Sequence, residues 1–264
     1  MRIRRRGTLA RRSRVCAGAH PGARPLDLAA ADVDARKIAA MSWDEWSRGT
    51  EVEPSLYAAD FSRLGEQIET LLVAGARIFH FDVGDAHFVP PVTIGPIVLQ
   101  WISPIVHRAG GRLDCHLMVD EPAKHFGAIA EAGGDSVTFH YEVTADVEGL
   151  AGEARSLGLA VGLAFKPQSE PEDVAEAAGP VDLVLCMSIN PGYSGQAFMP
   201  EAIGRVERLR DVLPPGKHIQ VDGGVGADNI PRLRSAGADL LVAGTSVFGA
   251  DDIAQAYRDL AALS

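Results

Sequence analysis

Two patterns of apolar and polar residues alternate along most of the chain. Short apolar runs are typical of buried strands, and the longer stretches between them repeat apolar residues at helical spacing. The strand-like runs lie at residues 53–59, 77–83, 112–119, 135–142, 160–165, 181–189, 218–224 and 239–246. The clearest helix-like stretches lie at residues 60–76, 122–134 and 200–213. The pattern therefore predicts an α/β protein in which strands and helices alternate.

Eight strands, each followed by a candidate helix, predict a (β/α)8 TIM barrel with parallel strands. We expect this barrel to form one domain over residues 50–264. A doubly wound sheet is the rival architecture, but it usually has fewer strands and carries a GxGxxG fingerprint after the first of them. No such fingerprint follows the first run, PSLYAA. The barrel is therefore the favoured fold.

Polar side chains interrupt the apolar runs near their ends. His80 and Asp82 lie in the second run and are two residues apart, so they point to the same face of a strand. His116 lies in the third run and Asp222 in the seventh. The C-terminal ends of barrel strands meet at one face, so these four groups can converge there. Two imidazoles and two carboxylates suit a divalent Zn, Fe, Mn or Co ion, although the sequence does not identify which.

A buried histidine has a simpler explanation, because most are hydrogen-bonded core residues. We interpret His140, in the fourth run, in this way. For His80 the neighbouring Asp82 favours a metal ligand instead, since an unpaired polar pair in a core would be costly.

Six segments resemble, in order, the motifs of the ribulose-phosphate 3-epimerase family. They are PSLYAADFSRLGEQI, FHFDVGDAHFVPPVTIGP, LDCHLMVDEP, MSINPGYSGQAF, VDGGV and AGTSVF. The resemblance covers about residues 53–260. It implies a catalytic barrel of the ribulose-phosphate-binding type that binds one divalent metal ion and a sugar phosphate. Because relatives assemble as dimers or larger, it also leads us to expect a homo-oligomer.

The resemblance assigns the metal to His80, Asp82, His116 and Asp222, and the acid/base pair to Asp82 and Asp222. Epimerisation at C3 of a ketose phosphate removes a proton next to the carbonyl and returns one to the opposite face. One carboxylate is needed on each side, in opposite protonation states, and the metal stabilises the enediolate. The default reaction is the conversion of D-ribulose 5-phosphate to D-xylulose 5-phosphate.

Glycine-rich segments follow the last three strands and predict a phosphate site, because backbone N–H groups there can approach an anion closely. They read NPGYSGQ, DGGV and AGTSV. Together with the family's contact serine and two methionines, the expected substrate-binding residues are Ser55, His116, Met118, Met187, Gly192, Tyr193, Ser194, Gly195, Gly223, Gly224, Gly244 and Thr245.

The chain departs from the family pattern at several positions near the site. Gly84 stands in place of a methionine, Ala86 and Ser194 in place of glycines, Pro91 in place of an asparagine, and Ala58 in place of a polar residue. We expect Gly84 to widen the cavity, which favours two alternatives: a six-carbon substrate such as allulose 6-phosphate, or a catalytically weak barrel that only binds sugar phosphates. A decarboxylase or aldolase would carry a lysine beside the acidic strand end, and FHFDVGDAH has none.

The first 24 residues contain eight Arg and no Asp or Glu. They show no hydrophobic periodicity, so we predict a disordered Arg-rich extension over residues 1–45. One interpretation is sequence upstream of a true start at Met41. The Arg-rich, acid-free character also suits an organelle transit peptide.

Charge and cysteine content exclude several classes of partner. The formal net charge is -10, and beyond residue 24 there are 17 Lys and Arg against 35 Asp and Glu, which argues against a nucleic-acid partner. No apolar run reaches the ~18 residues that a spanning helix needs, so we expect no membrane partner. Cys16, Cys115 and Cys186 form no CxxC pair, which fits a reducing cytoplasm.

Overall fold

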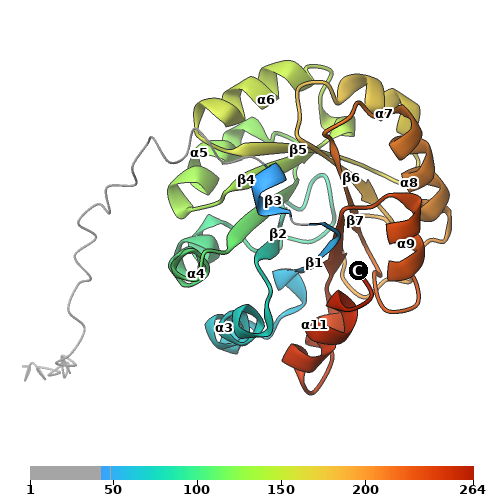
Figure 1. Cartoon of the computed structure of the whole chain (residues 1–264). Helices are drawn as coiled ribbons and strands as arrows, with labels where there is room; N and C mark the ends of the chain where they lie inside the picture. The colour runs from blue at the N-terminus through green and yellow to red at the C-terminus, as the bar shows by residue number, and fades with distance from the viewer. Residues whose placement is uncertain (1–42, 48) are drawn as a thin grey trace, which may run out of the picture. The chain divides into compact units, whose positions relative to one another are not determined.

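The computed structural model describes residues 43–47 and 49–264 (Figure 1). Within them, eight parallel strands form a nearly closed barrel, which confirms the predicted fold. The strands are β1 (Glu51–Pro54), β2 (Ile78–Gly84), β3 (Arg112–Met118), β4 (Ser136–His140), β5 (Ala160–Phe165), β6 (Leu183–Met187), β7 (His218–Asp222) and β8 (Leu240–Ala243).

The strand order closes the sheet on itself. Neighbours run β1-β8-β7-β6-β5-β4-β3-β2, and every pairing is parallel. The two ends of this order meet at a single parallel bridge between Ser55 and His80. The bridge places the end of β1 directly beside the residue that begins the polar pair in β2.

Helices follow the strands and surround the barrel (Figure 1). They are α3 (Leu64–Ala74), α4 (Pro96–Arg108), α5 (Ala123–Ala132), α6 (Val147–Ser156), α7 (Pro171–Ala177), α8 (Glu201–Val212), α9 (Ile230–Ala236), α10 (Thr245–Phe248) and α11 (Ile253–Ala261). Three of them end at a glycine with positive φ: Gly75 after α3, Gly133 after α5 and Gly237 after α9. These glycines belong to the recurrent Ala-Gly turns that precede β2, β4 and β8, and they terminate each helix in the left-handed region.

The first strand differs from its predicted position. β1 ends at Pro54, and Leu56–Ala58 form a 3-10 helix, η1, where the sequence pattern predicts continued strand. Pro54 precedes Ser55, whose N–H still pairs with the carbonyl of Ala243 in β8. Leu56 is fully buried although it lies outside the strand, and this apolar side chain made the turn resemble a strand in the sequence. Two further 3-10 helices of the same length, η2 (Phe61–Arg63) and η3 (Tyr141–Val143), follow η1 and β4 respectively.

Alternation along each strand separates the helix-facing core from the barrel interior. In β2, Phe79 and Phe81 share a buried cluster with Leu64 and Ile68 of α3, so they face the helices. Their neighbours Ile78, His80 and Asp82 therefore face inward. Every residue of β2 is buried, which explains why the strand is apolar apart from His80 and Asp82.

A short helix, α2 (Trp43–Trp46), covers the N-terminal end of the barrel (Figure 1, blue). Trp43 and Trp46 are 1% and 4% exposed, and they share a buried cluster with residues at the start of several strands, such as Ile78. Most of the predicted disordered extension, together with Cys16 and Met41, lies outside the described residues. Its last part, from Trp43, is instead packed onto the barrel, because two tryptophans bury a large apolar area there.

Inside the barrel the inward side chains form layers. The layer beside α2 is apolar and contains Ile78, Ala160, Leu183 and Leu240. The middle layer is polar and contains Glu53, His80, Asp114 and Gln220. The layer at the C-terminal ends of the strands contains Ser55, Asp82, His116 and Asp222. Each middle-layer residue lies two positions before a residue of the outer layer, so the strand repeat places one set directly beneath the other.

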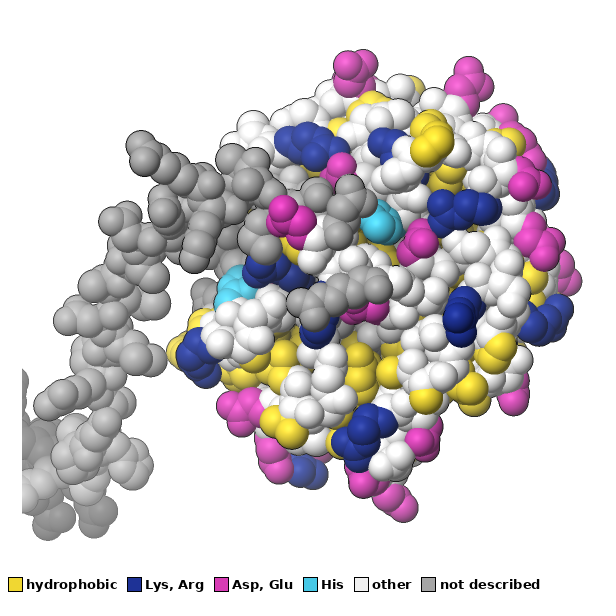
Figure 2. Space-filling view, viewed as in Figure 1, with side chains coloured by type: hydrophobic (Ala, Val, Ile, Leu, Met, Phe, Trp, Pro, Cys, Tyr) yellow, Lys and Arg dark blue, Asp and Glu magenta, His cyan; other side chains and the backbone are white. Residues whose placement is uncertain are grey.

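The outer surface is mixed in charge. Figure 2 shows acidic and basic side chains interspersed over the helical surface on the face drawn there. Among residues 43–47 and 49–264, no helix has the length and apolar character needed to cross a membrane.

Candidate active site

The structure brings His80, Asp82, His116 and Asp222 together at the C-terminal end of the barrel. One nitrogen or carboxylate oxygen of each lies within 4.8 Å of the others. Asp82 Oδ1 is central, at 3.3 Å from His80 Nε2 and 3.1 Å from His116 Nδ1. Asp222 Oδ2 lies 3.9 Å from the same His116 nitrogen. Strands β2, β3 and β7 supply these groups, which are far apart in the sequence.

The middle layer fixes the tautomer of His80. His80 Nδ1 lies 3.0 Å from Asp114 Oδ2, and Asp114 also accepts hydrogen bonds from Ser136 Oγ at 2.6 Å and Gln220 Nε2 at 2.8 Å. An ionised carboxylate can only accept, so His80 donates from Nδ1 and presents the lone pair of Nε2. Among the described residues, His80 Nε2 has no hydrogen-bond partner although it is fully buried. This nitrogen therefore faces Asp82, and in the neutral ring it carries the lone pair.

The donor set fits a divalent cation. A buried imidazole lone pair and two carboxylates converge on one point, and groups of this kind repel one another unless a positive charge lies between them. Nitrogen and oxygen donors without thiolate match the preferences of first-row divalent ions. Asp114 also provides the outer hydrogen bond that metal-binding histidines commonly make.

The electrostatics separate the two candidate acid/base groups. Burial would raise the pKa of Asp82, but His80 and His116 hold it well below its ordinary value. Burial and the negative charge of Asp82 raise the pKa of Asp222 to about 6. Burial alone would lower the pKa of His80, yet Asp82 and Asp114 raise it well above normal. The cluster thus favours added positive charge and gives its two aspartates different proton affinities.

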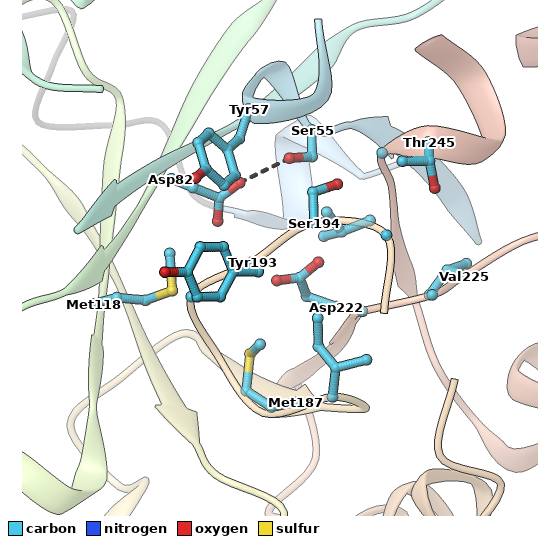
Figure 3. A pocket seen from close by; sticks show the side chains of 17 residues that line it. Ser55, Tyr57, Asp82, Met118, Met187, Tyr193, Ser194, Asp222, Val225 and Thr245 are labelled. Carbon is cyan, nitrogen blue, oxygen red and sulfur yellow. Dashed lines mark hydrogen bonds between the residues drawn. The ribbon is translucent and has the colours of Figure 1, made fainter. Parts of the chain in front are cut away.

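Two hydroxyl groups hold Asp82 in place. Ser55 Oγ donates to Asp82 Oδ2 at 2.7 Å, as Figure 3 shows. Thr93 Oγ1 donates to the Asp82 carbonyl at 2.7 Å and accepts from the Gly84 N–H at 2.6 Å. Ser55 was expected as a substrate contact, and its position beside both Asp82 and the pocket is compatible with that role.

A pocket opens directly above the four groups (Figure 3). Asp82 and Asp222 line it, whereas His80 and His116 lie beneath it and are fully buried. The other expected residues that line it are Ser55, Met118, Met187, Gly192, Tyr193, Ser194, Gly195, Gly223, Gly224, Gly244 and Thr245. Sequence reasoning missed Tyr57, Ile189, Val225 and Val242, which also line it. Tyr57 and Ile189 follow Ser55 and Met187 by two residues, a spacing that could have indicated them.

Two glycines in the loop after β7 allow neighbouring loops to approach the pocket. A Cβ atom at Gly223, which has φ of 118°, would lie 2.3 Å from Ile189 Cγ1. A Cβ atom at Gly224, with φ of 63°, would lie 2.7 Å from the Phe198 nitrogen. Both positions therefore require glycine for steric and conformational reasons. This leaves the backbone after β6, β7 and β8 exposed to the same end of the pocket.

The expected widening at Gly84 is not what the structure shows. Gly84 does not line the pocket, and a Cβ atom there would lie 2.9 Å from Val89 Cγ2 and 3.1 Å from Thr93 Cγ2. Val89 is 1% exposed, so the loop at residues 85–93 fills the space that a larger side chain would take. Within this loop Ala86 has φ of 62°, a left-handed conformation that explains why glycine is the usual residue there.

His140 is a hydrogen-bonded core residue, as interpreted from the sequence, and its partner is a member of the site. Its Nε2 lies 2.9 Å from His116 Nε2, and its Nδ1 lies 3.1 Å from Glu142 Oε2. Burial lowers the pKa of His140 to about 4, so the ring is neutral near neutral pH.

Sequence comparison identifies similar proteins. The model of the ribulose-phosphate 3 epimerase family matches residues 51–248. A ribulose-phosphate 3-epimerase of Eremothecium gossypii is 40% identical over 209 residues, covering 76% of this chain and 87% of that protein. The Schizosaccharomyces pombe protein of the same name is 40% identical over 200 residues, with the same coverage of each. That of Mycobacterium tuberculosis is 39% identical over 215 residues, covering 80% and 92%.

Solved structures similar to the chain share its fold. Tryptophan synthase of Mycobacterium tuberculosis superposes with a TM-score of 0.62 at 16% identity, covering 81% of this chain and 92% of that chain. Orotidine 5'-phosphate decarboxylase of Pyrococcus horikoshii superposes with a TM-score of 0.59 at 16% identity, covering 80% and 98%. At this identity the likeness concerns the barrel alone.

Proposed function

The chain belongs to the ribulose-phosphate 3-epimerase family and is an epimerase, and on that premise we propose that it interconverts D-ribulose 5-phosphate and D-xylulose 5-phosphate. The observation that carries the proposal is the pair Asp82 and Asp222. They line one pocket from β2 and β7, and their pKa values are shifted in opposite directions. A reaction that removes a proton from one face and returns one to the other needs two such groups.

The two aspartates divide the proton transfers. Asp82, ionised, takes the proton from C3, and Asp222, protonated, delivers one to the opposite face; their roles exchange in the reverse direction. Ser55 donates to Asp82 Oδ2 and so leaves Oδ1 directed at the cluster. Met118 and Met187, both buried beside the pocket, limit the access of water to the reacting carbon.

The group that these residues fit is a divalent Zn, Fe, Mn or Co ion. His80, Asp82, His116 and Asp222 would hold it. When bound, the ion would stabilise negative charge on the substrate oxygen next to the reacting carbon. The fixed tautomer of His80 supports this assignment, because it directs a free lone pair at the shared point.

The phosphate is assigned to the end of the pocket formed by the loops after β6, β7 and β8. Gly195, Gly223, Gly224 and Gly244 line that end together with Thr245. Backbone N–H groups and a hydroxyl are the donors available there, and both suit a phosphate. Assembly into a homo-oligomer and a cytoplasmic location stay predictions of the resemblance and the composition.

An epimerase assay over several ketose phosphates tests the proposal. The metal-loaded protein should convert ribulose 5-phosphate, measured by the appearance of xylulose 5-phosphate. Turnover of allulose 6-phosphate alone would instead identify a six-carbon substrate, and binding without turnover would identify a sugar-phosphate-binding barrel. The loop that fills the space beside Gly84 removes the reason for preferring either alternative.

A further inference from the structure

We propose that Glu142, acting through His140, sets the tautomer of His116 and so makes its Nδ1 available to a cation. Glu142 and His140 are positioning residues in this account, since neither touches the pocket. The inference rests on the proposed function, because it takes His116 as a metal ligand. We refer to Glu142, His140 and His116 together as the tautomer chain.

The tautomer chain is continuous in the structure. Glu142 Oε2 lies 3.1 Å from His140 Nδ1, and His140 Nε2 lies 2.9 Å from His116 Nε2. The two imidazole planes are inclined by only 28° and their centroids lie 5.1 Å apart, so the rings meet edge to edge through this hydrogen bond. Both histidines are fully buried, whereas the Glu142 side chain is 21% exposed. The tautomer chain therefore connects the buried base of the site to the edge of the barrel.

Glu142, at the outer end of the tautomer chain, determines which nitrogen donates and which accepts in each of its hydrogen bonds. Glu142 Oε1 is already occupied by the Lys166 N–H at 2.7 Å and by Ser169 Oγ at 2.6 Å. These donors anchor an ionised carboxylate, which can only accept hydrogen bonds. His140 must then carry its proton on Nδ1, and its Nε2 must accept. His116 must in turn donate from Nε2, and in the neutral ring that a metal ligand requires this leaves the lone pair on Nδ1, the atom that otherwise hydrogen-bonds Asp82 Oδ1 at 3.1 Å.

That lone pair is on the correct nitrogen. His116 Nδ1 is the atom that lies 3.1 Å from Asp82 Oδ1 and 3.9 Å from Asp222 Oδ2. His80 reaches the same point through its other nitrogen, Nε2, because Asp114 takes its Nδ1 proton. The two histidines thus present opposite ring nitrogens, and each is directed by a different carboxylate.

Packing holds His140 in this orientation. The Phe88 ring lies against His140 with centroids 4.6 Å apart, and Lys166 Nζ lies 3.7 Å from the centroid of Phe88. A half-turn of the imidazole would put carbon atoms in place of both nitrogens, so it would break the hydrogen bonds to Glu142 and His116. The tautomer is therefore decided by hydrogen bonding and not by rotation of the ring.

The variant Glu142→Gln tests the direction of the tautomer chain without changing the size of the side chain. The Lys166 N–H can only donate, so the new amide oxygen stays on it and the amide NH2 faces His140 Nδ1. His140 would then protonate at Nε2 and donate to His116, which would place the His116 proton on Nδ1. We expect about 10–100-fold weaker Co²⁺ and Zn²⁺ affinity, the usual effect of losing an outer partner of a histidine ligand.

A second variant and a control complete the test. His140→Phe keeps an aromatic ring against Phe88 but removes the acceptor for His116 Nε2, and it should weaken Co²⁺ affinity to a similar extent. Glu170→Gln removes the same charge from a neighbouring exposed residue that pairs with Arg208, and it should bind Co²⁺ like the wild type. Affinity is measured by titration of metal-free protein against a competing chelator, and folding by thermal denaturation of the metal-free proteins.

Nitrogen-15 NMR of the histidine rings in the Zn²⁺-loaded wild type reads the tautomers directly. A proton on His140 Nδ1 and on His116 Nε2, with both variants weakened, supports the proposal. A proton on His140 Nε2 in the wild type, or wild-type Co²⁺ affinity in both variants, overturns it. A wild-type protein that takes up no metal at all would instead refute the metal site in the proposed function.

Discussion

His80 Nδ1 and Asp114 Oδ2 lie 3.0 Å apart in the polar layer directly beneath the pocket. The contact fixes which nitrogen of His80 faces Asp82, so a residue that never reaches the pocket determines the chemistry at its base. The same layer contains Glu53, whose carboxyl accepts from Gln220 at 2.6 Å. The pKa values of these two buried acids are shifted in opposite directions, upward for Glu53 by burial and downward for Asp114 by His80 despite burial, and the difference can be tested.

Asp114→Asn should weaken divalent metal binding by about 10–100-fold, because it replaces the negative charge that holds the Nδ1 proton of His80 with a neutral amide. Glu53→Gln is the matched control, an acid-to-amide change in the same buried layer. Burial and the neighbouring Asp114 raise the pKa of Glu53 well above its ordinary value, which favours its neutral form, so the amide should change the charge there less than at Asp114. Metal titration should find Glu53→Gln close to the wild type. Equal losses in the two variants would contradict this division of charge.

Metal removal should abolish epimerase activity and lower the melting temperature. Ligand atoms of His80, Asp82 and Asp222 lie within 4.8 Å of one another, and removal of the cation takes away the positive charge that offsets the repulsion between the two carboxylates. Dialysis against a chelator, followed by the assay and thermal denaturation, measures both effects. The same chelator saturated beforehand with Zn²⁺ is the control. Full activity in a protein shown to be metal-free would exclude a role for the ion in the reaction.

Gly84→Ala should destabilise the fold by about 1–3 kcal/mol, the usual cost of overpacking. A Cβ atom at this position would lie 2.9 Å from Val89 Cγ2 and 3.1 Å from the Pro91 carbonyl oxygen. Gly127→Ala in α5 is the control, since a Cβ there has no atom within 4 Å, and it should stabilise by about 0.5–1 kcal/mol. Denaturant unfolding measures both values. An unchanged stability in Gly84→Ala would show that the 85–93 loop yields easily and that the pocket can widen.

Trp43→Ala should lower the free energy of unfolding by about 3–5 kcal/mol, the range for removing a large buried aromatic side chain. Trp43 is 1% exposed and packs on Trp46 with ring centroids 4.8 Å apart. Trp101→Ala in α4 is the comparison, because Trp101 is 67% exposed. Trp101→Ala should cost little, and a loss equally small for Trp43→Ala would show that α2 does not contribute to the folded barrel.

The barrel and the converging groups were predictable because they leave periodic signals in the sequence. Each predicted run overlaps one observed strand, and β5 occupies the predicted residues 160–165. His80 and Asp82 interrupt one such run at a spacing of two, and that spacing places both on the inner face. The register of β2 on β3, which pairs Asp82 with His116, then brings the third group beside them.

The polar layer beneath the site was missed although it left the same signal. Glu53, Asp114 and Gln220 lie two residues before Ser55, His116 and Asp222. An inward-facing residue two positions earlier lies one layer deeper, so the spacing could have indicated them. The function of these residues depends on contacts across the barrel, such as that of Gln220 with Asp114, and such contacts cannot be inferred from a local sequence pattern.

Loop conformation was the least predictable feature. The expected widening of the pocket at Gly84 assumed that a missing side chain leaves a space. Val89 occupies that space instead, because the 85–93 loop folds back onto β2. The contact of His140 with His116 was equally hidden, since the sequence identifies a buried histidine but not the partner that its ring reaches.

Exchange of the C3 proton of ribulose 5-phosphate with D2O, followed by NMR, tests the central claim most directly. Asp82→Asn and Asp222→Asn should each lose this exchange by at least about 100-fold, since each removes one of the two proton carriers. The exposed Asp173→Asn in α7 should exchange like the wild type. Wild-type exchange in either of the first two variants would contradict a reaction carried by one aspartate on each face of the sugar.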